Sequence, residues 1–592
     1  MKKNHHILYA ILFGILMLFL FSFMIQEHFK PFETKELRGY YQKPKKPTVS
    51  WKSYKSGLLQ QKTEHYITNY FGFREPIIRL YHQICWDLFG KEFVSYIHSG
   101  KQGWLYYGHN IRDYYGTEMY DWFADTTAAR QTYEKEVRLL NKVKGILEQY
   151  DVTLLTFIAP SKGVVYPEFL PNQERDTTSL NARVYYARRF AETGIPCFEM
   201  NPYFLQMKDT CRFCLFPPTG DHWNFSCVYA TDSLLRFMEP LRGIHLPHVE
   251  YGDEYLTECS IGEDRNRDLE GELNLLRPIR VNPKYASLER EYHVVCDTNT
   301  TKPAVLFIGN SFLQRSIAYL PPEELFSDFQ FWYYNRVAYQ GADQVIDSVK
   351  DLQRLDYLLD ADYIVFFSSA SQMYRATEGF AEDAILQLCV GEERFRQRKQ
   401  QVIDSLFHDQ ATHNRIAWKY PDSLYLVKLQ TYTEEQLRKE PETYFPELAG
   451  DDVPTARNPL LLTDEYWAQR DLRRQIKADP NWLLAVSSAM ATDNLSLQQA
   501  INLEVSNIRQ GLPSLQNKDV SPEEYKEILI KQMEKKIYND PEWFKGLKKI
   551  AEEKGYDLDN WIHRNAVYMI NTQIQEGKIK LPEKKESNDL NP

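Results

Sequence analysis

The sequence predicts an α/β protein with a parallel sheet flanked by helices, preceded by one membrane-spanning helix and followed by an all-helical region. Three observations carry this prediction. Short apolar runs alternate with helical patterns between about residues 95 and 395. An uncharged apolar run occupies residues 7–25. Beyond residue 463, a helix pair that begins with Asp-Pro occurs twice.

Length and charge exclude some classes of protein. At 592 residues the chain is too long for one hydrophobic core, so we expect two or three folded units. The net charge is −10, which offers no basic footprint for nucleic acid. Aromatic residues make up 14% of the chain and provide surface for burial or for stacking on a ligand such as a carbohydrate.

The N-terminus has the pattern of a signal anchor. Lys2 and Lys3 precede the apolar run of residues 7–25, which as a helix would span roughly 28 Å. The run is longer than a usual signal-peptide core, and no small-residue cleavage site follows it. The lysines predict that residues 1–6 lie in the cytoplasm and that residues 7–25 cross the inner membrane. The bulk of the chain would then be periplasmic or otherwise extracytoplasmic.

The rest of the chain divides by composition. Residues 26–94 form a Lys- and Pro-rich stalk and a helical lead-in, and residues 95–395 form the α/β domain. A linker rich in Pro and charge covers residues 396–462. Residues 463–580 form a two-copy helical repeat, in which Asp479-Pro480 recurs as Asp540-Pro541. We expect residues 581–592 to be disordered.

Within the α/β domain, each element is predicted from its own pattern. Buried strands are expected at 152–160, 195–199, 305–309, 329–334 and 363–368, because these are short apolar runs bounded by turn residues. Helices are expected at 128–149, 179–193, 229–238 and 380–389, where apolar positions recur at helical spacing.

A serine and a histidine follow strands of this predicted sheet. The run Val305–Ile308 ends in Gly309-Asn310-Ser311, which places Ser311 at the carboxyl edge of the sheet and at the start of a helix. Taken alone, this serine is also explained as an ordinary helix N-cap. His222 lies in the polar loop 217–224, so the two residues could meet as nucleophile and general base.

Five motifs in order resemble those of a known family. They lie at residues 70–75, 100–107, 159–168, 220–224 and 308–312. Together they resemble the SGNH hydrolase-like domain of the alginate O-acetyltransferase family, of the AlgJ/AlgX type, over about residues 60–390. The resemblance implies a flavodoxin-like SGNH fold and an exported enzyme that handles acetyl groups on a cell-surface polysaccharide.

The resemblance also implies roles for particular residues. Ser311 would be acylated, and His222 would take its proton and later activate the incoming sugar hydroxyl. The backbone N–H of Ser311 would help to hold the oxyanion. No cofactor is implied. The polysaccharide, the membrane and a membrane-bound O-acyltransferase that donates acetyl groups are the expected partners.

The sequence departs from the family pattern in two places. Asn310 stands where the family has Asp before the serine, and Asn keeps the same turn preference. The family also has an Asp two residues before the histidine, where this chain has Gly220. The adjacent Asp221 is our candidate for the acid, although neighbouring side chains on an extended loop point to opposite sides. A bent loop, a remote acid, a backbone carbonyl or a Ser-His dyad are the alternatives.

Further candidates are weaker. Lys162 would brace a loop or contact the substrate, Tyr319 and Arg336 would line a substrate groove, and Asn310 would contact substrate or oxyanion. The residues at the end of the last strand, Ser369, Ser371 and Gln372, could donate to an oxyanion or cap a loop. Cys211, Cys214, His222 and Cys227 have zinc-like spacing, but an exported protein favours a disulfide or simple burial, so we expect no metal.

Two functions follow from these patterns. The first is a polysaccharide O-acetyltransferase or acetylesterase that forms an acetyl-enzyme on Ser311. The second is a catalytically inactive SGNH-like subunit that binds or assembles a cell-surface glycan, and Gly220 is the residue that favours it.

Overall fold

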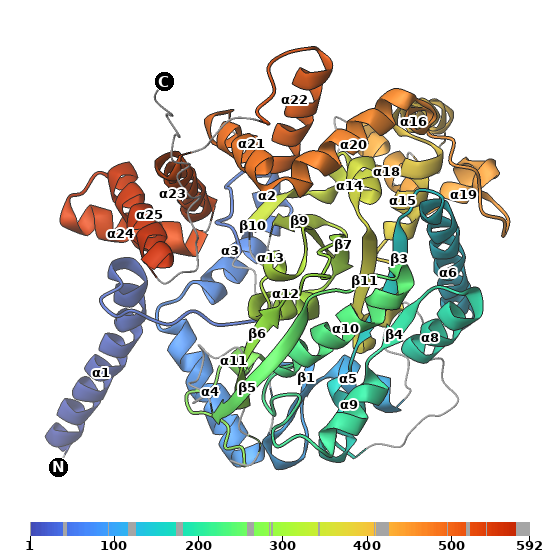
Figure 1. Ribbon diagram of the computed structural model, residues 1–592. Coiled ribbons are helices and arrows are strands. Elements are labelled where there is room, and N and C mark those ends of the chain that lie inside the picture. The colour runs from blue at the N-terminus through green and yellow to red at the C-terminus, as the bar shows by residue number, and fades with distance from the viewer. Residues whose placement is uncertain are drawn as a thin grey trace, which may run out of the picture.

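The computed structural model contains a central seven-stranded sheet with helices on both faces (Figure 1). The strands are β3 (Thr153–Ala159), β4 (Cys197–Glu199), β7 (Ala304–Gly309), β8 (Asp328–Tyr333), β9 (Val337–Gln340), β10 (Gln344–Ser348) and β11 (Tyr363–Ser369). The structure describes residues 2–575 except 40–43, 91, 93, 116–125, 173–180, 257–265, 283–284, 286–287, 341–343, 408, 410–411, 413–424, 494, 517–520 and 540.

The sheet is mixed, which corrects the prediction of a parallel sheet. Its strand order is β10-β9-β8-β7-β11-β3-β4, and the five strands from β8 to β4 are parallel. After β8 the chain turns back through Tyr334 and Asn335, both of which have positive φ. Such a turn joins adjacent antiparallel strands, so β9 and β10 extend the edge as a meander.

The order of the parallel strands also differs from that of flavodoxin. In flavodoxin-like sheets the strands follow the order 2-1-3-4-5. Here the last strand in sequence, β11, lies between β3 and β7 and pairs with both. The chain reaches this position through the β9–β10 meander and α14 (Arg354–Asp360), which return it from the sheet edge to its centre.

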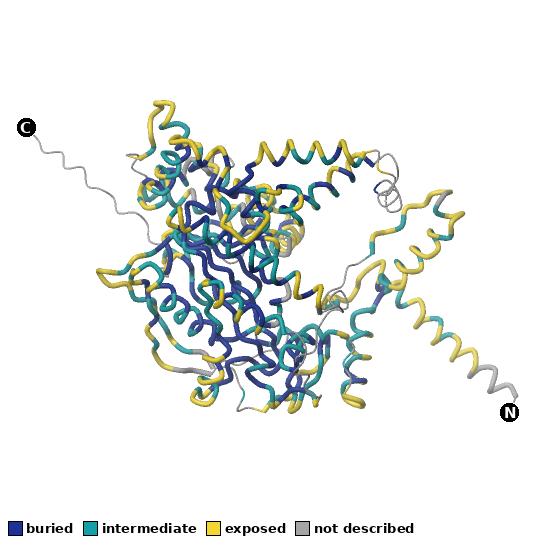
Figure 2. The backbone as a smooth tube through the Cα atoms, turned by 90° about the vertical axis from the view of Figure 1, so that its right-hand side faces the viewer, coloured by how far each residue is buried: buried dark blue, intermediate teal, exposed yellow. Residues whose placement is uncertain are grey.

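Each face of the sheet carries its own core. Alternate strand residues such as Leu306 and Phe366 pack with α6 (Thr126–Glu148), α8 (Ala182–Thr193), α14 and α15 (Phe380–Cys389). Their neighbours Phe307 and Phe367 pack on the opposite face with α10 (Ser226–Arg242) and α12 (Ser311–Tyr319). Figure 2 shows this buried interior at the centre of the molecule. Four of these helices correspond to the predicted ones.

Shorter elements surround the carboxyl edge of the sheet. The strands β1 (Ile97–Ser99) and β2 (Leu105–Tyr107) form a hairpin. The chain also forms the helices α5 (Gly108–Tyr115), α7 (Lys162–Val165), α9 (Asn201–Lys208) and α13 (Pro322–Leu325).

An insertion between α10 and β7 was not predicted. It contains the antiparallel pair β5 (His248–Leu256) and β6 (Leu288–Val295), and between them the short helix α11 (Asp268–Leu273). Leu269 and Leu273 of α11 pack in a small core with Ile97 and Leu105 of the hairpin. The insertion is therefore fastened beside the carboxyl edge of the sheet.

The N-terminal region is helical. It contains α1 (Lys2–Phe29), α2 (Trp51–Lys55), α3 (Leu58–Asn69) and α4 (Arg74–Phe89). The segment Tyr9–Phe29 of α1 is long and apolar enough to cross a membrane. Many of its apolar residues are exposed, and in Figure 2 the N-terminal helix extends away from the rest of the chain.

The stretch expected to be a linker holds several helices. These are α16 (Glu392–Leu406), α18 (Tyr425–Lys439) and α19 (Pro441–Tyr444). Leu437, Phe445 and Leu448 are buried in the same core as the sheet, so this stretch is part of the domain rather than an extended connection. Its apolar residues are separated by many charged residues in the sequence. Their packing in the core of the sheet shows that they form a buried face.

Six helices follow in the C-terminal region, with the bounds α20 (Asp464–Ala478), α21 (Pro480–Asp493), α22 (Leu497–Arg509), α23 (Pro522–Asn539), α24 (Pro541–Lys554) and α25 (Leu558–Gln575). They form two separate small cores, one for α20–α22 and one for α23–α25. The Asp479 carboxylate accepts from the Asn481 and Trp482 N–H groups, as an N-cap should. Asp540 and the expected disordered tail 581–592 lie outside the described residues, and an internal repeat stays a prediction.

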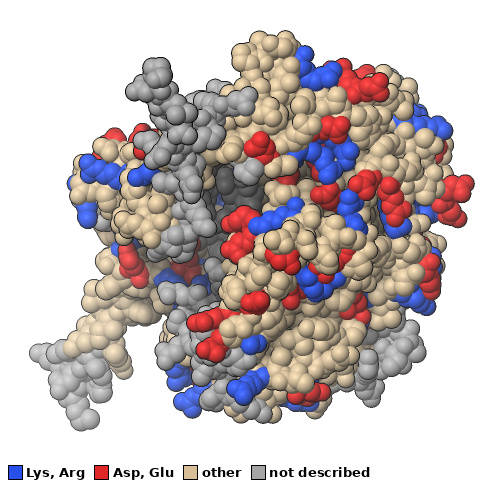
Figure 3. All heavy atoms as spheres, in the orientation of Figure 1, with Lys and Arg blue, Asp and Glu red and all other residues tan. Residues whose placement is uncertain are grey.

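The helix α20 is fastened to the amino edge of the sheet by charge. Buried Arg473 contacts Asp360 at 3.0 Å, and Lys477 contacts Asp328 at 2.8 Å. Elsewhere, Lys/Arg and Asp/Glu side chains are interspersed over the face drawn in Figure 3. Ion pairs thus hold α20 at the amino edge of the sheet. The candidate site lies at the opposite, carboxyl edge.

Candidate active site

The strand β7 delivers Ser311 to the carboxyl edge of the sheet. β7 lies between β8 and β11, and its residues from Val305 to Ile308 are buried. A Cβ at Gly309 would lie 2.8 Å from Leu313 Cδ2 and 3.2 Å from Phe367 Cβ, so a larger residue here would force these neighbours to shift. Asn310 then caps α12, because its side-chain Oδ1 atom accepts from the Phe312 N–H at 3.1 Å. Ser311 is therefore the first residue of the helix and not its cap.

His222 lies within hydrogen-bonding distance of this serine. Its Nε2 atom is 2.8 Å from the Ser311 hydroxyl oxygen. The next residue, Trp223, holds the histidine loop against α12, since its indole N–H donates to the Phe312 carbonyl at 3.1 Å. The Trp223 side chain is fully buried, so it is a packing residue rather than an exposed platform for a sugar.

The residue that contacts the other nitrogen of His222 is Asp268. Its Oδ2 atom lies 2.5 Å from His222 Nδ1, and its Oδ1 atom accepts from the backbone N–H of Asp221 at 2.8 Å. Asp268 is the first residue of α11, 46 residues beyond His222 in the sequence. Ser311, His222 and Asp268 thus have the connectivity of a serine-hydrolase triad.

Asp221 does not occupy the position of the triad acid, which corrects our candidate. Its side chain is only 4% exposed and turns away from His222, where its Oδ1 atom accepts from Asn110 Nδ2 at 2.6 Å. Adjacent residues of this loop point to opposite sides, as expected for an extended chain. Of the alternatives considered above, the structure has the remote acid.

Gly220 makes room for that acid. A Cβ at Gly220 would lie 2.8 Å from Asp268 Oδ1 and 2.8 Å from the Asn266 carbonyl oxygen. Contacts of that length are not tolerated, so a side chain at position 220 and the present position of Asp268 exclude each other. The loop therefore lacks an acid at position 220, and the space that Gly220 leaves is occupied by the acid from α11.

The charges around His222 favour its protonated form. Burial by itself would lower the pKa of His222, but the charge and hydrogen bond of Asp268, with the charge of Asp221, raise it above its ordinary value. Arg315 of α12 opposes this rise. Burial would likewise raise the pKa of Asp268, but His222 and the Asp221 N–H lower it, so Asp268 stays ionised.

Lys162 braces the histidine loop from inside the protein. It is fully buried, and its ammonium donates to the carbonyls of Leu105, Pro218 and Gly220 at 2.7, 2.9 and 2.6 Å. Burial lowers its pKa, whereas the charges of Asp221 and Asp268 oppose that change. Three carbonyl partners identify a bracing role, and they fix the backbone two residues before His222.

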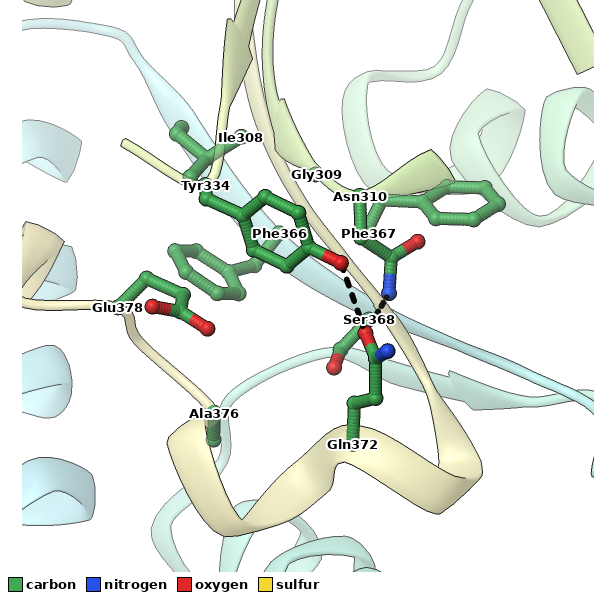
Figure 4. Close-up of a pocket in the computed structure, with 10 residues that line it drawn as sticks. All are labelled: Ile308, Gly309, Asn310, Tyr334, Phe366, Phe367, Ser368, Gln372, Ala376 and Glu378. Atoms are coloured by element: carbon green, nitrogen blue, oxygen red, sulfur yellow. Dashed lines mark hydrogen bonds between the residues drawn. The ribbon is translucent and has the colours of Figure 1, made fainter. Parts of the chain in front are cut away.

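A small pocket opens beside Asn310, with about 260 Å³ of space that includes open solvent. Figure 4 shows the Tyr334 hydroxyl and the Asn310 amide both directed at Gln372. The distances to Gln372 Oε1 are 3.2 Å from Tyr334 Oη and 3.0 Å from Asn310 Nδ2. Asn310 Nδ2 also donates to Ser369 Oγ at 3.1 Å, so this amide organises the pocket wall.

The remaining candidates make no contact with Ser311 among those described for the structure. Tyr319 ends α12, where its ring packs edge-on against Phe225. The Arg336 side chain is 70% exposed and lies 3.9 Å from Glu378, a residue of the pocket wall. The side chain of Ser371 lies outside the described residues. Both ring nitrogens of His222 are engaged by Ser311 and Asp268, which separates this histidine from the cysteines of the zinc-like spacing. The part of the chain that the structure describes holds no group of three metal-ligating side chains.

Sequence reasoning missed Asp268 and Asn110. The signal that could have pointed to Asp268 is the gap at Gly220, which calls for an acid from elsewhere. The chain has 81 acidic residues, and nothing in the pattern around Asp268 distinguishes it from the others.

The fold and the site together define a serine-hydrolase-like α/β domain. Residues 97–321 match the family described as the SGNH hydrolase-like domain of acetyltransferase AlgX, which confirms the resemblance stated above. Among solved structures, the chain is similar to the O-acetyltransferase domain of Pseudomonas putida AlgJ, with 12% identity and a TM-score of 0.32 over 47% of this chain and 92% of that one. It is also similar to Pseudomonas aeruginosa AlgX, with 13% identity and a TM-score of 0.30 over 48% of this chain and 65% of that one. No curated protein sequence matches the chain.

Proposed function

We propose that this protein is an extracytoplasmic polysaccharide O-acetyltransferase or acetylesterase that forms an acetyl-enzyme on Ser311. The observation that carries the proposal is the continuous chain of contacts from Ser311 through His222 to Asp268. A serine hydroxyl is a poor nucleophile unless a base accepts its proton, and the base works best when an acid holds its other nitrogen.

In the first half-reaction, Ser311 Oγ attacks the acetyl carbonyl carbon while His222 Nε2 takes the hydroxyl proton. Asp268 holds the ring and stabilises the imidazolium that forms. The Ser311 N–H, at the first position of α12, belongs to the amides that a helix leaves without intrahelical partners, and it would donate to the developing oxyanion. His222 then returns the proton to the departing oxygen, which leaves acetyl-Ser311 and a free alcohol.

In the second half-reaction, a hydroxyl of the acceptor gives its proton to His222 and attacks the acetyl carbon. The Ser311 oxygen leaves and recovers the proton from His222. A sugar hydroxyl as acceptor gives O-acetylation, and water gives hydrolysis. The same residues serve both outcomes, so the choice depends on which acceptor is bound.

The expected location and partners follow from α1 and from the family that residues 97–321 match. The protein would be a single-pass inner-membrane protein with its catalytic domain outside the cytoplasm. A cell-surface polysaccharide would be the acceptor, and a membrane-bound O-acyltransferase is a candidate acetyl donor. Alginate is the first polysaccharide to test, because residues 97–321 match the family described as the SGNH hydrolase-like domain of acetyltransferase AlgX and resemble the alginate O-acetyltransferases.

The test uses the purified full-length protein with a small acetyl ester. Wild-type protein should release acetate and, after rapid quenching, carry one acetyl group on the peptide that contains Ser311. Ser311→Ala and His222→Ala should lose both signals, with a fall of at least about 1,000-fold in acetate release. The control Ser316→Ala, five residues farther along α12, should behave like the wild type. Equal and negligible turnover by wild-type protein and Ser311→Ala would contradict the proposal.

A second assay separates transfer from hydrolysis. Wild-type protein is incubated with the acetyl ester and unacetylated oligosaccharides, including oligomannuronate. A transferase should form O-acetylated oligosaccharide at the expense of free acetate, whereas an esterase should release only acetate. The inactive-subunit alternative rested on the acid missing at Gly220, and that reason no longer holds because Asp268 contacts His222.

A further inference from the structure

A path of contacts links the end of α1 to the triad acid. It runs along residues 30–39, which follow α1 and which we call the strap. At its start, the Gln26 side-chain amide binds both backbone groups of Phe32, accepting from the N–H at 3.2 Å and donating to the carbonyl. Gln26 is only 5% exposed, so this first contact is built into the protein.

The end of α1 is itself fastened to the turn before α4. Phe23 packs edge-on against Phe71 and Phe73, with ring centroids 6.0 and 6.3 Å apart. A Cβ at Gly72 would lie 2.2 Å from the Phe23 carbonyl oxygen, which shows how closely the two backbones approach. The strap therefore starts from a fixed point.

At its other end, the strap binds the C-terminus of α11. The Asn274 side-chain amide accepts from the Arg38 N–H at 2.9 Å and donates to the Arg38 carbonyl at 3.0 Å. Asn274 is 5% exposed and takes the left-handed conformation that ends α11, with φ of 52°. The same amide also donates to the Glu272 carbonyl at 2.8 Å.

The helix α4 holds the same end of α11. His82 Nδ1 lies 2.8 Å from the Leu273 carbonyl oxygen, and Gln83 Oε1 accepts from the N–H groups of Leu276 and Arg277 at 3.0 and 2.8 Å. Both residues lie on α4, which follows the turn that α1 packs against. The membrane-proximal part of the chain thus contacts α11 twice.

The opposite end of α11 carries Asp268 and contacts the histidine loop. There the Glu270 N–H donates to the Thr219 carbonyl at 3.1 Å, and Asp268 reaches the Asp221 N–H and His222. α11 has six residues and is not part of the sheet. Because so short a helix moves as a unit, the position of its C-terminus sets the direction of the Asp268 carboxylate.

We propose that the strap is a positioning element for the catalytic acid, which acts through Asn274 and α11 to hold Asp268 against His222. The inference rests on the proposed role of Ser311 as a nucleophile. It makes the segment next to the predicted membrane anchor part of the catalytic machinery. Asn274 is the positioning residue, because one side-chain amide joins the strap to α11.

The test replaces Asn274 by glycine in the full-length protein. Glycine accepts the left-handed conformation at no steric cost, so the backbone is kept and only the amide is lost. Asp151→Gly is the matched control, since Asp151 also has positive φ, of 59°, but precedes β3 at the amino edge of the sheet. Unfolding temperatures of the two variants report whether folding is preserved.

The readout is the rate at which a fluorophosphonate labels Ser311, measured against pH. Labelling requires neutral His222, so its rate rises as pH increases through the pKa of His222. The charged and titratable groups that influence that pKa are Asp268 of α11, Asp221 of the same loop, Arg315 of α12 and His109 of α5. Asn274→Gly should lower the plateau rate by about tenfold, because acid and base lose their alignment. It should also move the acidic side of the pH profile to lower pH by about half a unit, because protonated His222 is then stabilised less by the Asp268 carboxylate.

A double variant separates positioning from a general loss of structure. If the strap acts through Asp268, Asn274→Gly should lower the rate by less than about twofold in protein that already carries Asp268→Asn. A full tenfold effect in that background, or a wild-type profile for Asn274→Gly alone, would overturn the inference. A third outcome is that Ser311 is labelled with the expected pH dependence but the protein never turns over an acetyl ester. That outcome would count against the proposed function, and the effect of the strap on labelling could still be measured.

Discussion

The loop 217–224 and the helix α11 bring two parts of one site together in different ways. The loop lies between α9 and α10, carries its histidine in a compact motif, and is held by Trp223 and Lys162. α11 lies in an insertion outside the sheet and brings Asp268 from 46 residues away. The proposed base is therefore a local feature of the chain, whereas the proposed acid depends on contacts between distant segments.

The largest effect should come from Asp268→Asn. The substitution keeps the shape of the side chain but removes the charge that orients His222, so the plateau of kcat/KM should fall by about 100- to 10,000-fold. Asp268 also raises the pKa of His222. Without it the imidazolium is less stable, and the acid limb of the pH profile should move to lower pH. A variant with normal rate and an unmoved limb would show that α11 supplies no acid.

Gly220→Ala should have the next largest effect. The added Cβ would lie 2.8 Å from Asp268 Oδ1, so the carboxylate must move away from His222. We expect a fall of about 10- to 100-fold in kcat with little change in KM, since the damage concerns alignment and not binding. Gly546→Ala is the steric control, because Gly546 lies within α24 and a Cβ there meets no atom within 4 Å. Unchanged kcat in Gly220→Ala would mean that the loop can shift without loss of the acid.

Lys162→Met should weaken the support of the loop 217–224. Three carbonyls would lose their donor, and we expect the free energy of unfolding to fall by about 2–4 kcal/mol. Because one of those carbonyls belongs to Gly220, kcat should fall by about tenfold at temperatures where the variant is folded. Chemical denaturation measures the first effect and ester turnover the second. Full stability would indicate that the ammonium is dispensable as a brace.

The smallest effect should come from Asp221→Asn. Asp221 contacts Asn110 and not His222, so the plateau rate should change by no more than about threefold. Its charge does raise the pKa of His222, and the acid limb should therefore move slightly to lower pH. A pH–rate profile of this variant beside Asp268→Asn ranks the two carboxylates directly. If Asp221→Asn were the more damaging variant, the assignment of the acid would be reversed.

Much of the fold could be predicted from pattern. Several predicted elements correspond to observed ones, namely the strands β3, β7 and β11 and the helices α6, α10 and α15. Their buried residues form continuous apolar runs in the strands and recur at helical spacing in the helices. The β9–β10 meander was missed, since it depends on the left-handed pair Tyr334 and Asn335, and tyrosine gives no sign of such a turn. The helices within 396–462 were missed because their apolar residues are dispersed among charges.

The sequence alone pointed to Ser311 and His222, the proposed nucleophile and base of the candidate site. Val305–Ser311 and the loop around His222 are short segments whose residue types follow from local geometry: a buried strand, a glycine where backbones pass closely, and a helix start. Only the tertiary structure decided the acid. Asp268 reaches His222 because an insertion packs beside the sheet edge and because Gly220 leaves space for its carboxylate. Both conditions depend on distances between segments far apart in the chain, and a linear pattern carries no such distances.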